Sequence, residues 1–426
     1  MKLTPFQFNL LVFTIGLGAT AQANLGFAHF SFSELILIGL VPFAIFSKRS
    51  LSGSALVIPL VLLGFWILSA CISDFFINGT YRAQAYKGIF RTIIFGMCLI
   101  SLHSLFRLNP LAWRYYVIGA FFSAILGFTI FKAGSISVMK EFGEVRGTDW
   151  AQTYNYIFSG ALGILNAWFF IKFPRFICSL IISLGGLNIL LGSRSSGAIQ
   201  ILVGLVTLYF VIFYLSRRRR KKFQLKSSQI LVAGTLCLLA AISVYLSYSF
   251  LAGGGYIGED AKSKYLKQSR SSMGLVFGGR RETYAGLLAV KDKPIFGHGS
   301  FALDIQGYWA GAIEDLGGGS DTGRRAGYLY HIPHHSRIVQ AWVEHGVAGA
   351  IFWVYLLYFY AQFIRRSILS CPPLLGVLIG IVFAAYWHYI FSPIGFRVTM
   401  ASSIALVFAV YDRQVKAAGN RRRPRG

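Results

Sequence analysis

The sequence has few charged residues, and most of those are basic. Only 13% of its 426 residues are Asp, Glu, Lys or Arg, which is about half the share in soluble domains. Asp and Glu number 15 against 41 Lys and Arg, so the net charge is +26. The basic residues lie mainly at the ends of apolar runs, as the positive-inside rule predicts for a membrane protein. This distribution excludes a soluble domain and argues against a nucleic-acid partner.

Cysteine and recognisable sets of metal ligands are also scarce. The five cysteines are scattered, without C-x-x-C spacing, which argues against a disulfide framework or a zinc site: Cys71, Cys98, Cys178, Cys237 and Cys371. No Asp-x-Asp pair or His/Cys/Asp cluster indicates a bound divalent ion. We therefore expect neither a metal nor a cofactor.

Long apolar runs are what the sequence has in abundance. Hydrophobic residues make up 55% of the chain, and runs near twenty residues recur along its whole length. The runs are continuous rather than alternating, which favours helices over the strands of a membrane β-barrel. The predicted fold class is an all-α polytopic membrane protein. We expect twelve transmembrane helices, near residues 6–23, 30–47, 55–73, 88–106, 114–132, 154–172, 176–192, 196–215, 229–251, 346–364, 374–391 and 398–411.

The positions of Lys and Arg predict the orientation of these helices. With a cytoplasmic N-terminus, the inside connections hold 22 Lys and Arg and the short outside connections hold 7. Both termini are therefore predicted to be cytoplasmic. Residues 1–251 would hold nine helices, 252–345 one long outer loop, and 346–426 three helices and a basic tail. The basic run Arg217–Lys222 is predicted to meet anionic lipid headgroups at the inner surface.

The outer loop concentrates imidazole and guanidinium groups. It holds five of the eight histidines and several arginines: His298, His331, His334, His335, His345, Arg280, Arg281, Arg324, Arg325 and Arg337. Such groups in one water-facing segment of a membrane protein indicate chemistry or anion binding.

Pro333 gives the loop a predicted helix start. A proline blocks a helix before it and favours one after it, so His334, His335 and Ser336 would lie at the N-terminus of a helix running toward Gly346. That end carries partial positive charge and free amides, which favour an anion and lower the pKa of a nearby histidine. A neutral imidazole there suits a general base.

The order of several short motifs resembles the O-antigen ligase and polymerase superfamily. The turn Pro294–Gly299 resembles the family's PxFGxG segment, and the pair His335–Ser336 is followed by residues that resemble its ExGxxG helix start. Arg280 and Tyr284 resemble an arginine followed four residues later by an aromatic residue, usually tryptophan in the family. The turn Leu191–Ser195, which contains Arg194, resembles a GSR turn between two earlier spans. The matching positions after the histidine are Val339, Gln340, Glu344, Gly346 and Gly349.

The resemblance implies a metal-independent, GT-C-like glycosyltransferase of the bacterial inner membrane. Such an enzyme transfers a glycan from an undecaprenyl diphosphate carrier to an acceptor hydroxyl at the periplasmic face, which would make 252–345 a periplasmic loop. Guanidinium groups suit a diphosphate leaving group because they form bidentate hydrogen bonds. The implied catalytic residue is His335, with His334 as the alternative. The implied donor ligands are Arg194, Arg280 and Arg281, and the supporting residues are Glu344, Tyr284, Arg337 and His298.

Three functions stay open at this point. A ligase would use lipid A-core as the acceptor and complete lipopolysaccharide, whereas a polymerase would extend the glycan with the same donor. A transporter or flippase is disfavoured because the predicted spans hold few charged residues, of which Glu34 and Arg91 are the clearest. Structural roles also stay open for Glu344 and His298, as does a solvated loop charge for Arg324, Arg325 and Arg337.

Overall fold

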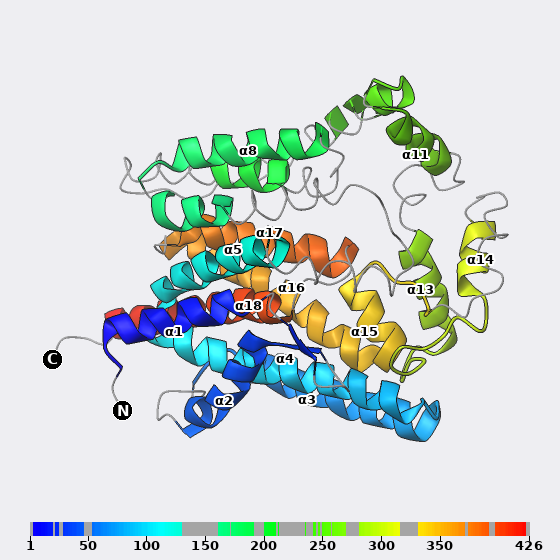
Figure 1. The fold of residues 1–426 in the computed structure, drawn as a ribbon, viewed down its shortest axis with the longest axis horizontal. Coiled ribbons are helices and arrows are strands. Elements are labelled where there is room, and N and C mark those ends of the chain that lie inside the picture. The colour runs from blue at the N-terminus through cyan, green and yellow to red at the C-terminus, as the bar shows by residue number, and fades with distance from the viewer. Residues whose placement is uncertain are drawn as a thin grey trace.

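The computed structural model is mostly helical (Figure 1). It describes residues 3–19, 22–24, 29–46, 53–129, 161–170, 172–190, 200–209, 212, 235, 242–243, 246–247, 249–256, 258–269, 281–315, 331–370, 374–391 and 397–422. Its named helices are α1 (Pro5–Leu17), α2 (Phe32–Phe46), α3 (Val57–Cys71), α4 (Arg82–Leu108), α5 (Trp113–Thr129), α8 (Pro174–Leu190), α11 (Glu259–Ser269), α13 (Arg281–Asp292), α14 (Tyr308–Asp315), α15 (Arg337–His345), α16 (Val347–Ser370), α17 (Leu375–Phe391) and α18 (Arg397–Arg422). A short antiparallel hairpin, β1 (Gln22–Asn24) and β2 (His29–Ser31), joins α1 to α2.

Within the described residues, three helices are long and apolar enough to cross a membrane. They are Val57–Ile77, Arg82–Leu108 and Val347–Ser367, and they match the predicted spans 55–73, 88–106 and 346–364. Shorter apolar helices occupy other predicted spans: Pro5–Leu17, Phe32–Phe46, Pro174–Leu187, Gln200–Tyr209 and Leu375–Ile390. The predicted all-α class is confirmed, whereas the number twelve stays a prediction.

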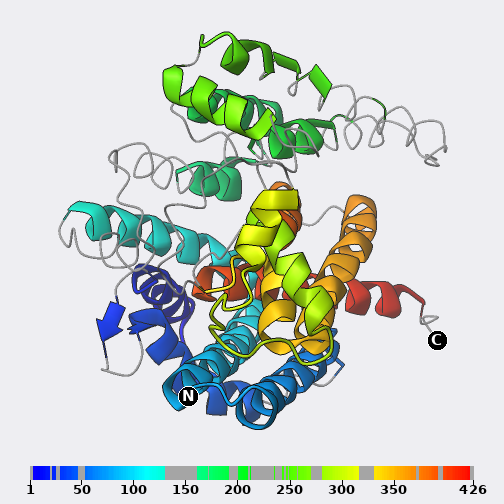
Figure 2. The ribbon, with the colours of Figure 1, turned by 90° about the vertical axis from the view of Figure 1, so that its right-hand side faces the viewer.

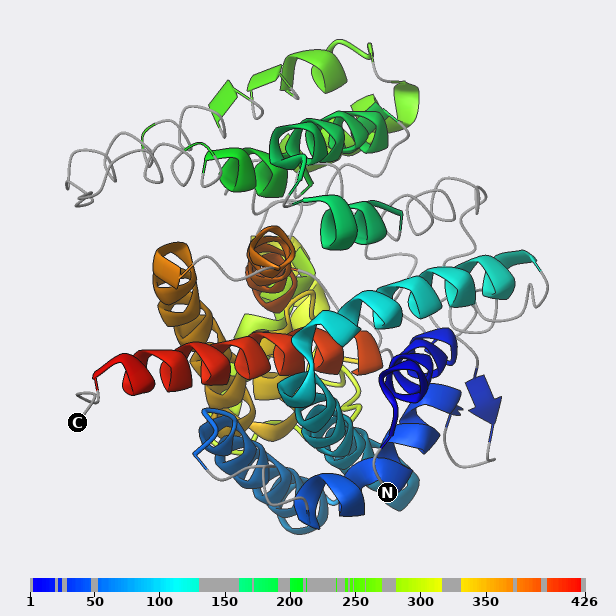
Figure 3. The same cartoon turned by 90° about the vertical axis from the view of Figure 1, so that its left-hand side faces the viewer.

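The centre of the bundle is formed by α3, α4, α16 and α18 (Figure 3). The stretch 404–409 of α18 is buried on every side, as expected of a helix in the middle of a bundle. Aromatic rings interlock between the helices: Trp66 of α3 and Phe95 of α4 pack against Phe352 and Trp353 of α16, with ring centroids 5.5–6.1 Å apart. Close van der Waals packing of this kind holds helices together in an apolar surrounding.

Networks of charged and polar side chains lie at the two ends of this bundle. At one end, Asp412 of α18 binds the Ser54 hydroxyl at 2.7 Å and lies 3.8 Å from Arg107 of α4. At the other end, Arg91 of α4 forms an ion pair with Glu344, the residue before the last of α15. We call the latter the site end, because the loop residues gather there. Arg397, at the start of α18, lies with Arg91 at the site end, so α4 and α18 run in the same direction, as the predicted topology requires.

At the site end, α3 continues into one π-helical turn, Ile72–Ile77. A π turn adds an extra residue to the helix and often marks a functional position. Here it turns Ser73 and Asp74 inward, and both side chains are fully buried.

The loop segments pack over the site end of the bundle. Figure 2 shows the yellow-green α13 and α14 above the blue α3 and α4, and α13 packs against α15. A small apolar cluster joins α13 to α15 through Ala289, Val290, Ile332, Val339 and Val343. The region predicted as one long loop is therefore folded, in its described parts, against the membrane helices.

Candidate functional site

Helix α15 is the element on which the site is built. Ser336 is its N-cap: the Ser336 hydroxyl accepts from the Val339 amide at 3.3 Å and donates to the Tyr389 carbonyl of α17 at 2.9 Å. Pro333 lies before the helix and Gly346 ends it, as predicted. The predicted start of the helix was wrong. The helix begins at Arg337 after the cap Ser336, so His334 and His335 lie before the cap and outside the helix.

The C-terminal carbonyls of α15 are bound by other parts of the chain. Helix ends leave such carbonyls without partners inside the helix. The Val343 and Glu344 carbonyls accept from the His298 and Gly299 amides at 2.7 and 2.9 Å. The hydroxyl groups of Ser69 and Ser73 donate to the last two carbonyls of the helix, at 2.7 and 3.3 Å. The PxFGxG-like turn and α3 thus fix where α15 ends.

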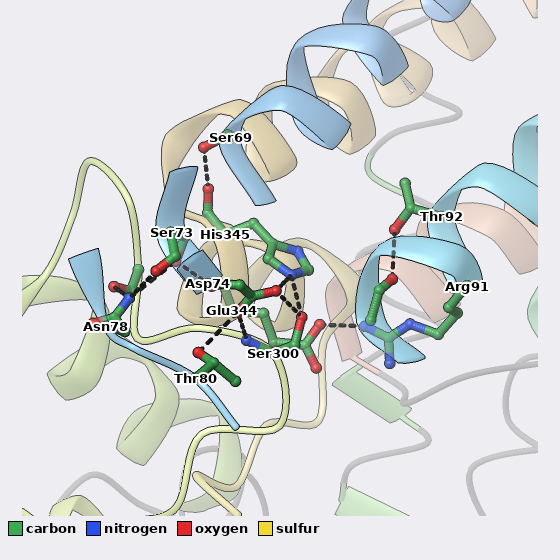
Figure 4. A network of polar contacts seen from close by, with 12 residues as sticks. Ser69, Ser73, Asp74, Asn78, Thr80, Arg91, Thr92, Ser300, Glu344 and His345 are labelled. Atoms are coloured by element: carbon green, nitrogen blue, oxygen red, sulfur yellow. Dashed lines mark hydrogen bonds and ion pairs between the residues drawn. The ribbon is translucent and has the colours of Figure 1, made fainter. Parts of the chain in front are cut away.

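Glu344 and Arg91 form a partly buried ion pair (Figure 4). The Glu344 carboxylate also accepts from the Gln340 side chain at 3.3 Å. Burial opposes ionisation of this carboxyl, but Arg91, with His345 and His334, outweighs burial and lowers the pKa of Glu344 to about 2. Glu344 is therefore ionised at neutral pH and holds Arg91 in place.

Arg337 is buried without a carboxylate partner among the described residues. Only 9% of its surface is exposed, its Nη1 donates to Gln340 at 3.0 Å, and its guanidinium lies 5.8 Å from the centre of the Trp353 ring. Its Nε has no hydrogen-bond partner in the described chain. Burial and repulsion from Arg91 lower the pKa of Arg337 to about 9, so it is still charged at pH 7. The sequence alternative of a solvated loop charge is wrong for this residue.

A small, open cleft lies between these groups and the first turn of α18. Its lining includes three guanidinium groups, those of Arg91, Arg337 and Arg397, together with Glu344 and apolar residues of α3, α4 and α16. Arg397, at the start of α18, is held by Glu34 of α2 through two nitrogens, at 2.7 and 3.1 Å. The cleft therefore places guanidinium groups beside apolar side chains, a combination that suits a small anionic group.

The two adjacent histidines lie at the edge of this cluster. Both are half-buried, and neither hydrogen-bonds to another described residue. Burial lowers the pKa of His334 to about 4, an effect that Arg91 and Arg337 strengthen and Glu344 opposes. His334 is therefore neutral at pH 7, which is the form required of a base. Its charged neighbours Arg91, Arg337 and Glu344 also line the cleft.

The other predicted donor ligands are only partly described. Arg194 and Arg280 lie outside the described residues. Arg281 is the first residue of α13 and is half-buried. The Tyr284 hydroxyl donates to Asp315 at 3.1 Å, which joins α13 to α14. The structure therefore leaves the predicted grouping of Arg194, Arg280 and Arg281 untested.

His298 has a structural position. Its Nε2 donates to the Ala289 carbonyl at 2.9 Å, and its ring packs edge-on against Tyr308 with centroids 5.4 Å apart. Burial lowers the pKa of His298, with a further contribution from Lys293 that outlying carboxylates oppose. The neutral imidazole of His298 thus links the turn to α13, which is a structural role.

His345 belongs to a buried chain of hydrogen bonds that runs in one direction (Figure 4). Trp66 can only donate, so its Nε1–H binds Nδ1 of His345 at 3.0 Å. The neutral ring then carries its proton on Nε2, which donates to the Ser300 hydroxyl at 2.8 Å. That hydroxyl donates to Asp74 at 2.7 Å. Burial lowers the pKa of His345, in keeping with this neutral form.

Sequence reasoning missed several of these residues. Asp74, Ser300 and Trp66 sit within or beside apolar runs and match no motif. Gly88 of α4 is the glycine at which the turn with Ser300 meets this helix. A Cβ at this position would lie 1.9 Å from the Ser300 hydroxyl, so only glycine lets the turn approach α4 this closely. Arg91 was noticeable as a charge inside a predicted span, and an intramembrane ionisable residue indicates a functional site.

No protein-family model matches the chain, and a search of curated proteins finds no match. The fold and the site together define a mostly helical protein with candidate membrane-spanning helices and an arginine-lined cleft at one end of the bundle. The resemblance to the O-antigen ligase and polymerase superfamily rests on the motifs in the sequence.

Proposed function

We propose that the protein is a glycosyltransferase of the bacterial inner membrane, an O-antigen ligase. It would transfer a glycan from an undecaprenyl diphosphate-linked donor to a sugar hydroxyl of lipid A-core at the periplasmic face. The observation that carries the proposal is the cleft of Arg91, Arg337 and Arg397 beside the pair His334–His335. Two of the motifs that resemble the family lie there, one in α15 and one in the turn that binds its C-terminal end.

The charge balance of the cleft supports a diphosphate ligand. Arg91 and Arg397 are each held by one carboxylate, of Glu344 and Glu34. Arg337 has no such partner in the described chain and is still buried. Glu344 attracts Arg337 without forming an ion pair with it. Burial of a charge that no carboxylate contacts directly is costly, and a bound anion would reduce that cost. The carrier diphosphate supplies the negative charge.

The transfer needs one proton acceptor and one stabilised leaving group. The acceptor oxygen forms a bond to the anomeric carbon while the bond from that carbon to the phosphate oxygen breaks. The acceptor proton goes to a histidine, and the bonding electron pair leaves with the diphosphate, whose charge the arginines stabilise. We propose His335 as the base, with His334 as the alternative. The alternative is kept because Arg91, Arg337 and Glu344 of the cleft act electrostatically on His334.

The proposed function also implies an orientation of the protein in the membrane. The site end of the bundle would face the periplasm, and both termini would lie in the cytoplasm. The arrangement of α3, α4, α16 and α18 supports this, since Glu344 of the predicted outer loop meets Arg91, which lies near the outer end of the predicted span 88–106. Residues predicted on the other side, such as Arg107 and Asp412, meet at the opposite end.

The test is reconstitution of the purified protein with a lipid diphosphate-linked glycan and two acceptors in separate reactions. Lipid A-core should accept the glycan, as followed by mass shift or gel mobility. Product in which one donor glycan is joined to another would make the protein a polymerase instead. If neither acceptor is glycosylated while the protein is folded, the glycosyltransferase proposal is wrong.

Two substitutions separate the histidines. His335→Ala should abolish transfer without changing membrane insertion, and His334→Ala should reduce transfer less. If His335→Ala keeps normal transfer and His334→Ala abolishes it, the base is His334. If each variant keeps the wild-type rate, neither imidazole takes the proton.

A further inference from the structure

Phe301 has an unusual backbone conformation for a bulky residue. Its φ is +56°, and it is the one non-glycine residue with positive φ in the described parts of the chain. The other described residues with positive φ are glycines, including Gly297 and Gly299 of the same turn. A bulky side chain is strained in this region, and such strain concentrates at functional positions.

The residues around Phe301 force this conformation. Before it, Ser300 is fully buried and bound to Asp74 through its amide at 2.5 Å and its hydroxyl at 2.7 Å. After it, Ala302 accepts from the Ile332 amide at 2.9 Å. The Phe301 carbonyl itself accepts from Nδ1 of His331 at 2.7 Å. The backbone is therefore fixed from both sides, and a glycine would fit it with less strain.

The ring of Phe301 is not packed in the hydrophobic core. Phe301 belongs to none of the apolar clusters found among the described residues, and it is half-buried. One neighbour of its ring is the His331 ring, with centroids 5.8 Å apart. The others are two cations of α4: Nζ of Lys87 lies 5.2 Å and the guanidinium carbon of Arg91 lies 5.1 Å from the ring centre. These distances fall within the range of cation–π attraction.

Arg91 is thus held from two directions. Glu344 binds one of its terminal nitrogens, Nη2, and the ring of Phe301 lies against the guanidinium. An arginine has five N–H donors, so the remaining donors are available to a ligand in the cleft that Arg91 lines. Lys87 is exposed and forms no ion pair with a described carboxylate, so it adds positive charge beside Arg91.

We propose that Phe301 is a positioning residue for anion binding: its ring holds Arg91 and Lys87 as a pair of cations at the mouth of the cleft. The ligand class is a diphosphate group. This inference rests on the proposed function for the identity of the natural ligand, but the contacts themselves require only an anion. The strained turn is retained because glycine, although better suited to the backbone, has no ring to place against the cations.

The experiment compares Phe301→Gly, Phe301→Leu and Phe301→Tyr in the purified full-length protein. Two quantities are measured for each: the affinity for inorganic diphosphate, by calorimetry, and the apparent unfolding temperature. Ile305→Gly is the matched control, because Ile305 is 73% exposed in the same loop. We expect Phe301→Gly to bind diphosphate about five- to thirtyfold more weakly, the range of a partly desolvated cation–π contact. Its unfolding temperature should be equal to or higher than that of the wild type.

The other variants test the cause. Phe301→Tyr keeps a ring and should bind as the wild type does, whereas Phe301→Leu keeps the strain without a ring and should bind as weakly as Phe301→Gly. If Phe301→Gly binds diphosphate with wild-type affinity, the proposal is wrong. It is also wrong if the variants lose affinity only where their unfolding temperature falls. Failure of the wild type to bind diphosphate would also overturn it. If the wild type binds diphosphate but transfers no glycan, the proposed function fails while this comparison still decides the role of Phe301.

Discussion

Arg91, Arg337 and Arg397 place three guanidinium groups around one cleft, and each is stabilised differently. Arg91 has a carboxylate and an aromatic ring, Arg397 has the Glu34 carboxylate, and Arg337 has a neutral amide and the Trp353 ring. Because the two carboxylates compensate only two of the three charges, the cleft keeps a local excess of positive charge. That excess is the physical basis for anion binding at this end of the bundle.

The ion pair between Arg91 and Glu344 should contribute measurably to stability. We expect the double-mutant cycle Arg91→Gln, Glu344→Gln to give a coupling free energy of roughly 1–3 kcal/mol, since the pair is mostly desolvated. Glu344→Gln alone should destabilise more than the double variant, because it leaves Arg91 without a counter-ion. Chemical unfolding of the purified variants measures this. Strict additivity of the two substitutions would show that the pair makes no net contribution.

His334 predicts a pH dependence of stability. Its folded-state pKa is about 4, below the ordinary value near 6.5. Between these values the unfolded chain binds a proton that the folded chain does not, so stability is lost as pH falls from about 6.5 toward 4. The loss assigned to this residue is roughly 2 kcal/mol after allowance for its partial exposure. In His334→Gln the unfolding temperature should change less between pH 6.5 and pH 4 than in the wild type. An equal dependence of unfolding temperature on pH in both proteins would contradict the assignment.

At the scale of elements, α15 depends on contacts made outside itself. It is a nine-residue helix, and isolated helices of that length are marginal in water. Ser336 caps its start, and amides of the turn and hydroxyl groups of α3 bind its last carbonyls. These external contacts fix the position of Glu344, and with it the position of Arg91.

The cap of α15 is testable through rescue. Ser336→Ala removes the acceptor for the Val339 amide and the donor to Tyr389, and should cost about 1 kcal/mol or more. It should also reduce glycan transfer, because α15 carries Arg337 and Glu344. Ser336→Asn supplies both a cap acceptor and a donor, so it should recover most of the stability and the activity. Equal behaviour of the two variants would show that capping is not what the serine does.

The sequence predicted part of this element and missed its surroundings. Pro333 and Gly346 marked the helix between them, because start and stop signals are local, but the helix begins at Arg337 and not at His334. Other contacts at its C-terminal end were not predictable. Ser69 and Ser73 bind its last carbonyls and Asp74 binds the adjacent Ser300, but all three lie more than 200 residues earlier, in or beside a run that reads as a membrane span. The π turn that directs two of them inward leaves no pattern in the sequence.

At the scale of the whole molecule, composition predicted the class and the charge pattern predicted the relative directions of helices. The all-helical class follows from continuous apolar runs, and three runs form helices of spanning length. The ion-pair partners across the bundle were not predicted, because they join residues far apart in the chain, such as Glu34 with Arg397 and Arg107 with Asp412. The grouping of Arg194 and Arg280 with the site stays a prediction.

Orientation in the membrane can be measured by labelling. In a cysteine-free background, Ile305→Cys at the site end should react with a membrane-impermeant maleimide in cells whose outer membrane has been opened. Val415→Cys, near the opposite end, should react only after the inner membrane is disrupted. The two positions are suitable because their side chains are 73% and 43% exposed. The reverse pattern would place the cleft in the cytoplasm and contradict the proposed orientation.

The most direct measurement of the central claim is the rate of glycan transfer by Arg337→Gln and Arg337→Lys beside the wild type. Removal of a buried cation without a carboxylate partner should not lower the unfolding temperature. The same change should reduce transfer by about a hundredfold or more, the cost of one charge-stabilising donor group, and lysine should not restore it, since it lacks the guanidinium fork. Wild-type transfer by a stable Arg337→Gln protein would contradict the account.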